Sequence, residues 1–179
     1  MARAERFGPG EEASELSPGD FILARRNHVI AGLISLAQKR RFRGQDSVYA
    51  HWSHAAIVEA PHSLIEAETR GILRSPLSKY RDGEYQVVRL EGELDTAQRG
   101  RVVAYAQGQI GQAFGFLDLL GACLYLLFGW PARWVRRHHE ICTSLVVRAL
   151  QEGGLLEELD PALTLPADLA KRFDVRTPP

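Results

Sequence analysis

Three short runs near the middle of the chain constrain its fold most, because each has the length and the β-branched content of a strand. They are SHAAIVE (residues 53–59), SLIEAE (63–68) and EYQVVRL (84–90). Turn residues separate them, so we predict consecutive antiparallel strands. Upstream, SPGDFILAR (17–25) places an apolar run after a Pro-Gly turn and predicts the first strand.

Helical periodicity appears before and after these runs. Apolar residues recur at helical spacing from Asn27 to KRRFRG (39–44), in DTAQRGRVVAYAQGQIG (95–111) and in EICTSLVVRALQEGG (140–154). A shorter helix start follows in LPADLAKRF (165–173). Helices combined with an antiparallel sheet predict an α+β fold.

Length and charge limit the class of protein. The 179 residues suit one domain, which we assign to residues 16–179, preceded by a flexible, polar arm at residues 1–15. Lys and Arg total 22, as do Asp and Glu, so the chain lacks a basic excess and we expect no nucleic acid partner. Two cysteines are too few for a disulfide framework, and residues 1–20 contain no apolar signal segment. We therefore expect a cytoplasmic protein with free thiols.

The most apolar segment is GFLDLLGACLYLLFGW (115–130). It contains Asp118 and is shorter than the ~20 residues that span a bilayer, so we expect a buried helix. A second interpretation stays open, because tryptophans and arginines follow in WPARWVRRHH (130–139), as they do at membrane interfaces. The KRRFRG stretch (39–44) could likewise contact anionic lipid or phosphate, so peripheral membrane contact is a partner hypothesis.

Cys142 lies in the first turn of the helix predicted at 140–154. There the unpaired backbone N–H groups and the positive end of the helix dipole favour the thiolate, which is the form that attacks a carbonyl. A buried structural cysteine is one alternative. A zinc site with His138 and His139 is another, although no CxxC or HExxH spacing accompanies it. We treat Cys123 as structural and expect neither a metal nor a cofactor.

A nucleophilic cysteine needs a base and a group that orients the base. The best base is His54, which opens the strand in SHAAIVE, and the best orienting carboxylate is Glu66, which needs a partner within its apolar strand. The two share a face only if even residues pair with even ones, through a three- or five-residue loop or a bulge. A two-residue turn at positions 61–62 would place Glu66 on the wrong face.

Neighbouring residues offer rivals for both roles. His51, which precedes the strand, is an alternative base that we place at the surface. Glu68 has the parity of Glu66 and would replace it if the register slipped by two residues. Glu59 belongs at the solvent end of its strand.

These residues, together with GD in SPGDFIL, GQAFGFLDLL (111–120) and the closing LPADL, resemble the permuted papain-like thiol hydrolases of the YiiX and YaeF kind. Those proteins are relatives of the NlpC-type cell-wall peptidases and of lecithin:retinol acyltransferase. The resemblance runs in order from about residue 17 to about residue 170. His54 precedes Cys142 in the chain, which is the permuted order.

The resemblance implies a papain-like core in which the cysteine helix packs on an antiparallel sheet. Cys142 would be the nucleophile, His54 the base and Glu66 the third polar residue. It also implies attack on an amide, ester or thioester carbonyl through an acyl-enzyme intermediate. Ile141 and Thr143 depart from the aromatic residue and the serine common at these positions, which bears on substrate shape.

We therefore predict a cysteine hydrolase, either an amidase or peptidase or an acyl hydrolase, with Cys142, His54 and Glu66 as candidate catalytic residues. The backbone N–H of Cys142 would contribute to an oxyanion hole. Peptide stems of cell-wall fragments and lipid-like acyl groups are competing substrates. The apolar segment favours an acyl group, and the expected lack of a signal peptide argues against direct access to the wall. A non-catalytic lipid- or peptide-binding module with the same fold is the alternative function.

Overall fold

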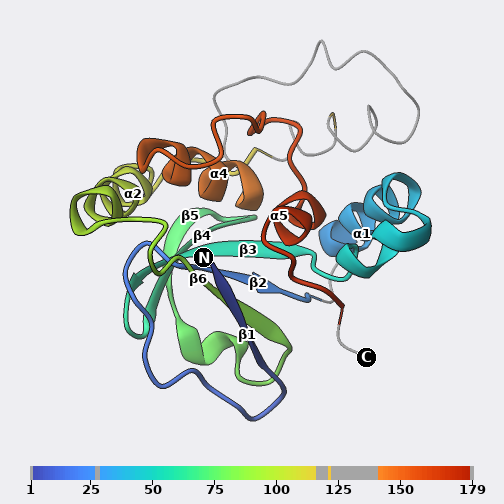
Figure 1. Ribbon diagram of the computed structural model, residues 1–179, viewed down its shortest axis with the longest axis horizontal. Helices are drawn as coiled ribbons and strands as arrows, with labels where there is room; N and C mark the ends of the chain where they lie inside the picture. Colours follow the sequence, from blue (N-terminus) through green and yellow to red (C-terminus); the bar gives the residue numbers. More distant parts are fainter. Residues whose placement is uncertain (1, 27–28, 116–120, 122–140, 178–179) are drawn as a thin grey trace.

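The computed structural model describes residues 2–26, 29–115, 121 and 141–177 of the chain. Within them the fold is α+β, with a six-stranded antiparallel sheet that carries helices on one face (Figure 1). No helix in these ranges is long and apolar enough to cross a membrane. Nearly all of the apolar segment at 115–130, including Asp118 and Cys123, lies outside the described residues.

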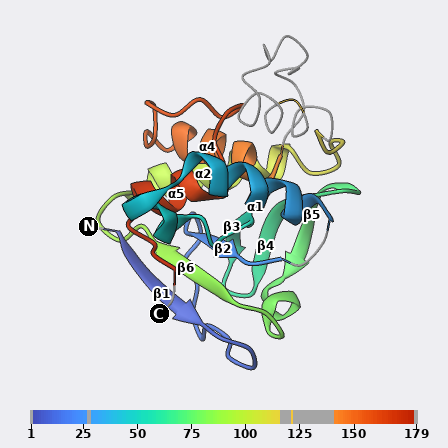
Figure 2. The same cartoon turned by 90° about the vertical axis from the view of Figure 1, so that its right-hand side faces the viewer.

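The strands are arranged in the order β1-β6-β2-β3-β4-β5, and each neighbouring pair is antiparallel. Figure 2 shows them spread from β1 at one edge to β5 at the other. Their bounds are β1 Arg3–Phe7, β2 Phe21–Ala24, β3 His54–Ala60, β4 Ser63–Glu68, β5 Gly71–Pro76 and β6 Tyr85–Arg89. The four runs that predict strands form β2, β3, β4 and β6.

The N-terminal edge of the sheet differs from the sequence prediction. The sequence predicts a flexible arm at residues 1–15, but this segment contains β1, which pairs with β6, and Ala13 is buried. Arg3 and Arg6 of β1 are exposed. An edge strand with charged, solvent-facing residues contains no apolar run. Its sequence therefore has the polar composition that is also typical of a flexible terminal arm.

The prediction of consecutive strands is wrong at β6. A further strand, β5, follows β4 and takes the place beside it, while β6 pairs with β1 and β2. The turn into β5 depends on Gly71, whose φ is +113° and whose added Cβ would lie 2.6 Å from the carbonyl oxygen of Gln112. Only glycine accepts both the positive φ and this close approach without strain.

The helices lie where the periodicity predicts them. They are α1 (Val29–Arg41), α2 (Thr96–Gly108), α4 (Cys142–Glu152) and α5 (Pro166–Arg172), with short 3-10 helices η1 (Gly44–Tyr49) and η2 (Leu77–Tyr80). Asp95 caps α2, because its side chain accepts the N–H of Gln98 at 2.7 Å and the Gln98 side chain accepts the N–H of Asp95 at 2.8 Å.

Two apolar clusters lie on either side of the sheet strands. The main cluster joins α4 to the sheet through, among others, Ala55, Ile57, Ile65, Leu145 and Val146. The second contains Ala56, Val58, Leu64, Tyr80 and Tyr85. Because successive strand residues point to opposite faces, β3 contributes its odd residues to the first cluster and its even residues to the second. His54 and Glu66 share the even parity.

Candidate active site

The cysteine that begins α4 is placed at an uncapped helix end. Cys142 is the first residue of α4 and is 4% exposed. Ile141, at the N-cap position, makes no side-chain capping bond, and its own N–H donates to the hydroxyl of Ser144 at 2.8 Å. The amides of a first turn have no partner within the helix. The positive end of the helix dipole therefore lies beside the thiol.

A β-bulge sets the relation between β3 and β4. Ala60 pairs with Ser63 across a two-residue turn, but Ile57 pairs with Ile65 and Val58 pairs with Leu64. Glu59 is the additional residue between these two registers. Without it, the two-residue turn would pair even residues with odd ones. The bulge thus restores even-with-even pairing, which is the condition for His54 and Glu66 to share a face.

The imidazole of His54 meets the carboxylate of Glu66 on that face. The distance from His54 Nε2 to Glu66 Oε2 is 2.7 Å, and the side chains are 8% and 0% exposed. The thiol of Cys142 also interacts with the His54 imidazole and contributes to its raised pKa. The structure thus brings all three predicted site residues together.

Two residues of η2 complete the surroundings of the carboxylate. Lys79 Nζ donates to Glu66 Oε1 at 2.6 Å, and the hydroxyl of Tyr80 donates to Glu66 Oε2 at 2.5 Å. Sequence reasoning missed both, because η2 lies in a stretch without apolar periodicity. A buried carboxylate needs compensating hydrogen-bond donors. A lysine and a tyrosine that follow β4 in the chain are the sequence signal that could point to the partners of Glu66.

The ionisation of the pair follows from these contacts. Burial alone would lower the pKa of His54, but hydrogen bonds to Cys142 and Glu66, and their negative charges, raise it to about 9. Burial alone would raise the pKa of Glu66, but the hydrogen bond and charge of His54 and the bond from Lys79 hold it well below its usual range. At neutral pH the site therefore holds an imidazolium at His54 beside the ionised carboxylate of Glu66, and a protonated imidazole next to a cysteine is an arrangement suited to a nucleophilic thiol.

The rival residues lie in other surroundings. His51 Nε2 pairs with Glu84 Oε2 at 2.8 Å. Glu68 accepts from Lys79 and, at 3.1 Å, from Arg26. Glu59 is bonded by Arg74 at 2.8 Å, so it is an ion-paired residue at the bulge.

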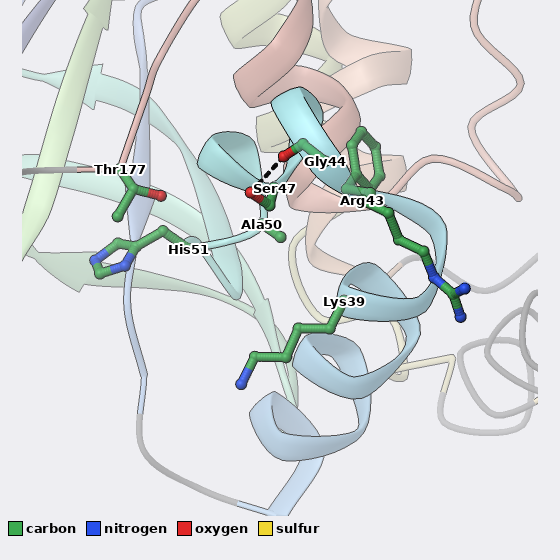
Figure 3. A pocket seen from close by; sticks show the side chains of 8 residues that line it. Lys39, Arg43, Gly44, Ser47, Ala50, His51 and Thr177 are labelled. Atoms are coloured by element: carbon green, nitrogen blue, oxygen red, sulfur yellow. Dashed lines mark hydrogen bonds between the residues drawn. The ribbon is translucent and has the colours of Figure 1, made fainter.

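A hollow of about 420 Å³ opens beside His51 (Figure 3). It lies between the end of α1, η1 and the C-terminal segment, and its lining includes Lys39, Arg43, Ser47 and Thr177. None of its lining residues belongs to the group formed by Cys142, His54 and Glu66. In Figure 3, Lys39 and Arg43 extend in opposite directions, so the hollow does not aim these two cations at one point.

The zinc alternative concerns residues that lie partly outside the described ranges. His138 and His139 are not among the described residues. Within the ranges that the structure covers, no group of three or more His, Cys, Asp and Glu side chains could hold a metal ion.

The GD pair of the resemblance has a structural explanation. Asp20 is fully buried, and its Oδ1 accepts the backbone N–H of Leu90 and a guanidinium N–H of Arg99, both at 2.9 Å. It therefore connects the start of β2 with the end of β6 and with α2.

Comparison of the chain with models of known protein families and with curated proteins found no match.

Proposed function

We propose that the protein is a cysteine hydrolase of amide or ester bonds. The observation that carries the proposal is the buried bond of His54 Nε2 to Glu66 at 2.7 Å, together with the interaction of the same imidazole with the thiol of Cys142. A nucleophile, a base and an orienting carboxylate in this order form the general arrangement of thiol hydrolases. Cys142 is also the first residue of a helix, where the dipole favours its anion.

In the proposed reaction the thiolate of Cys142 attacks the substrate carbonyl carbon, and the π electrons move to the carbonyl oxygen. The backbone N–H of Cys142, in the first turn of α4, donates to this oxyanion in the proposed reaction. The carbonyl then re-forms, the C–N or C–O bond to the leaving group breaks, and the imidazolium of His54 gives its proton to the departing amine or alkoxide. A thioester on Cys142 results.

Water resolves the acyl-enzyme. Neutral His54 accepts a proton from the attacking water, the new C–O bond forms, and the C–S bond breaks to release the acid and the thiolate. Glu66 keeps the imidazole oriented and stabilises its charged form in both halves. Another acceptor in place of water would make the protein an acyltransferase.

The papain-like topology belongs to the same proposal. Its support is the chain order His54, Glu66, Cys142 and the packing of α4 on β3 and β4 in the main apolar cluster. A small peptide or a lipid-like acyl compound is the proposed substrate. A protein with the same fold that only binds such compounds would form no covalent adduct.

The decisive experiment is detection of the acyl-enzyme by intact-protein mass spectrometry. The protein is incubated with p-nitrophenyl esters of short and long fatty acids and with a p-nitroanilide of an amino acid. We expect an acyl adduct on Cys142, with release of p-nitrophenol or p-nitroaniline. Cys123→Ala is the matched control, because it removes the other thiol of the chain and should leave the adduct intact.

Loss of the adduct in Cys142→Ala, together with retention in Cys123→Ala, would support the proposal. An adduct that persists in Cys142→Ala, or no adduct with any of these compounds, would contradict it. Comparison of the short and long esters with the anilide then separates the acyl and peptide hypotheses.

A further inference from the structure

The carboxylate of Glu66 is held from η2 as well as by His54. Lys79 Nζ lies 2.6 Å from Oε1, and the Tyr80 hydroxyl lies 2.5 Å from Oε2, the oxygen that also meets His54 Nε2. Two adjacent residues of one short helix thus occupy both oxygens. This arrangement fixes the carboxylate in rotation, because either bond alone would let it turn about its last side-chain torsion.

The same ammonium also balances charge. Lys79 donates to Glu68 and, at 3.3 Å, to Ser75, while Arg26 donates to the same oxygen of Glu68 at 3.1 Å. The charged or titratable groups of this site are His54 on β3, Glu66 and Glu68 on β4, Lys79 and Tyr80 on η2, Arg26 after β2, and Cys142 on α4. Glu66 itself is fully buried, and an uncompensated carboxylate in such a place takes up a proton.

We propose that Lys79 and Tyr80 are positioning residues, which keep Glu66 ionised and directed at His54 so that the imidazole stays oriented toward Cys142. The inference deepens the proposed function and rests on it for its catalytic meaning. Neither residue needs to touch the substrate, since both act through Glu66. Lys79 contributes charge, and Tyr80 contributes a directed donor.

The test is the rate of Cys142 alkylation by iodoacetamide as a function of pH, in a Cys123→Ala background. In Lys79→Met, Glu66 should take up a proton at higher pH, so the acid limb of the rate profile moves to higher pH and the rate on that limb falls ~10-fold. Lys79→Arg keeps the positive charge and should restore most of the rate. Tyr80→Phe should shift the limb in the same direction by less.

Lys171→Met is the matched control, because it also removes one lysine from an ion pair, with Asp46 at 2.7 Å, but at an exposed site. Its profile should coincide with that of the parent. Circular dichroism establishes that each variant is folded. If Lys79→Met does not fold, Lys79→Gln and Tyr80→Phe provide the same test.

Profiles of the folded Lys79 and Tyr80 variants that overlay the parent would overturn the inference, as would a Lys79→Met shift that Lys79→Arg does not reverse. This outcome is distinct from failure of the proposed function. A shifted acid limb in a protein that forms no acyl adduct would leave the positioning role standing. An acyl adduct with an unmoved limb would remove the positioning role alone.

Discussion

Two histidine–glutamate pairs involve histidines that lie three residues apart in the chain, and their bond lengths are nearly the same. The first pair joins His54 to Glu66 at 2.7 Å, and the second joins His51 to Glu84 at 2.8 Å. Side chains of the first pair are 8% and 0% exposed, whereas those of the second are 13% and 17% exposed. Distance therefore does not distinguish them.

Their further partners do. The first histidine also interacts with the thiol of Cys142, and the first carboxylate is bonded by Lys79 and Tyr80. In the second pair the imidazole stands edge-on to the ring of Trp52 at 4.7 Å, and the carboxylate pairs with Arg6, whose side chain is half-exposed. A histidine–carboxylate contact thus becomes a candidate catalytic unit through a third reactive group and through burial.

The largest difference between the pairs should appear in turnover. Removal of a general base lowers rates by 10²–10⁴, so His54→Ala should lower kcat/KM for a p-nitrophenyl ester by about 10³-fold. His51→Ala should leave kcat/KM unchanged, because its imidazole is engaged by Glu84. The release of p-nitrophenol measures both. An equal loss in the two variants would remove the distinction between the pairs.

Stability should separate the two carboxylates next. Glu66→Gln leaves the buried His54 imidazolium and the partly buried Lys79 ammonium facing a neutral amide, and should lower the free energy of unfolding by about 3 kcal/mol. Glu84→Gln weakens a partly exposed pair and should lower it by less than about 1 kcal/mol. Urea denaturation provides both values. If Glu66→Gln were no more costly than Glu84→Gln, burial would not explain the contrast.

The first pair should also make stability depend on pH. Although burial alone would lower it, the pKa of His54 is raised by hydrogen bonds to Cys142 and Glu66 from 6.5 to about 9. The stabilisation that this proton provides is therefore complete below pH 6.5 and is lost as the pH rises through about 9. The free-energy difference between the wild type and His54→Gln should shrink across that window. A difference that stays constant, or grows, would contradict the assignment.

The smallest effect should come from the surface end of the second pair. Arg6 Nη2 lies 2.8 Å from Glu84 Oε1, with the arginine side chain 48% exposed. Exposed ion pairs contribute little, so Arg6→Ala should lower the free energy of unfolding by about 0.3 kcal/mol. Urea denaturation at two salt concentrations measures the value and its screening. A loss of several kcal/mol would show that the second pair is coupled to the core.

The sequence by itself determined the local elements and the candidates. Strands β2, β3, β4 and β6 follow from short β-branched runs, and the main helices follow from apolar spacing and turn residues, because both signals arise from neighbours in the chain. The position of Cys142 at a helix start was equally local. The parity condition on His54 and Glu66 also came from the sequence, as a choice between two outcomes.

Only the tertiary structure decided between those outcomes. The bulge at Glu59 reverses the parity that the two-residue turn imposes, and a bulge is held by pairing across strands and by partners such as Arg74 rather than by its own sequence. The place of β6 beside β2 and the role of β1 as an edge strand also depend on pairing between distant segments. Lys79 and Tyr80 reach Glu66 for the same reason: β5 carries the chain back along β4, and this topology, not a local pattern, places η2 beside the buried carboxylate.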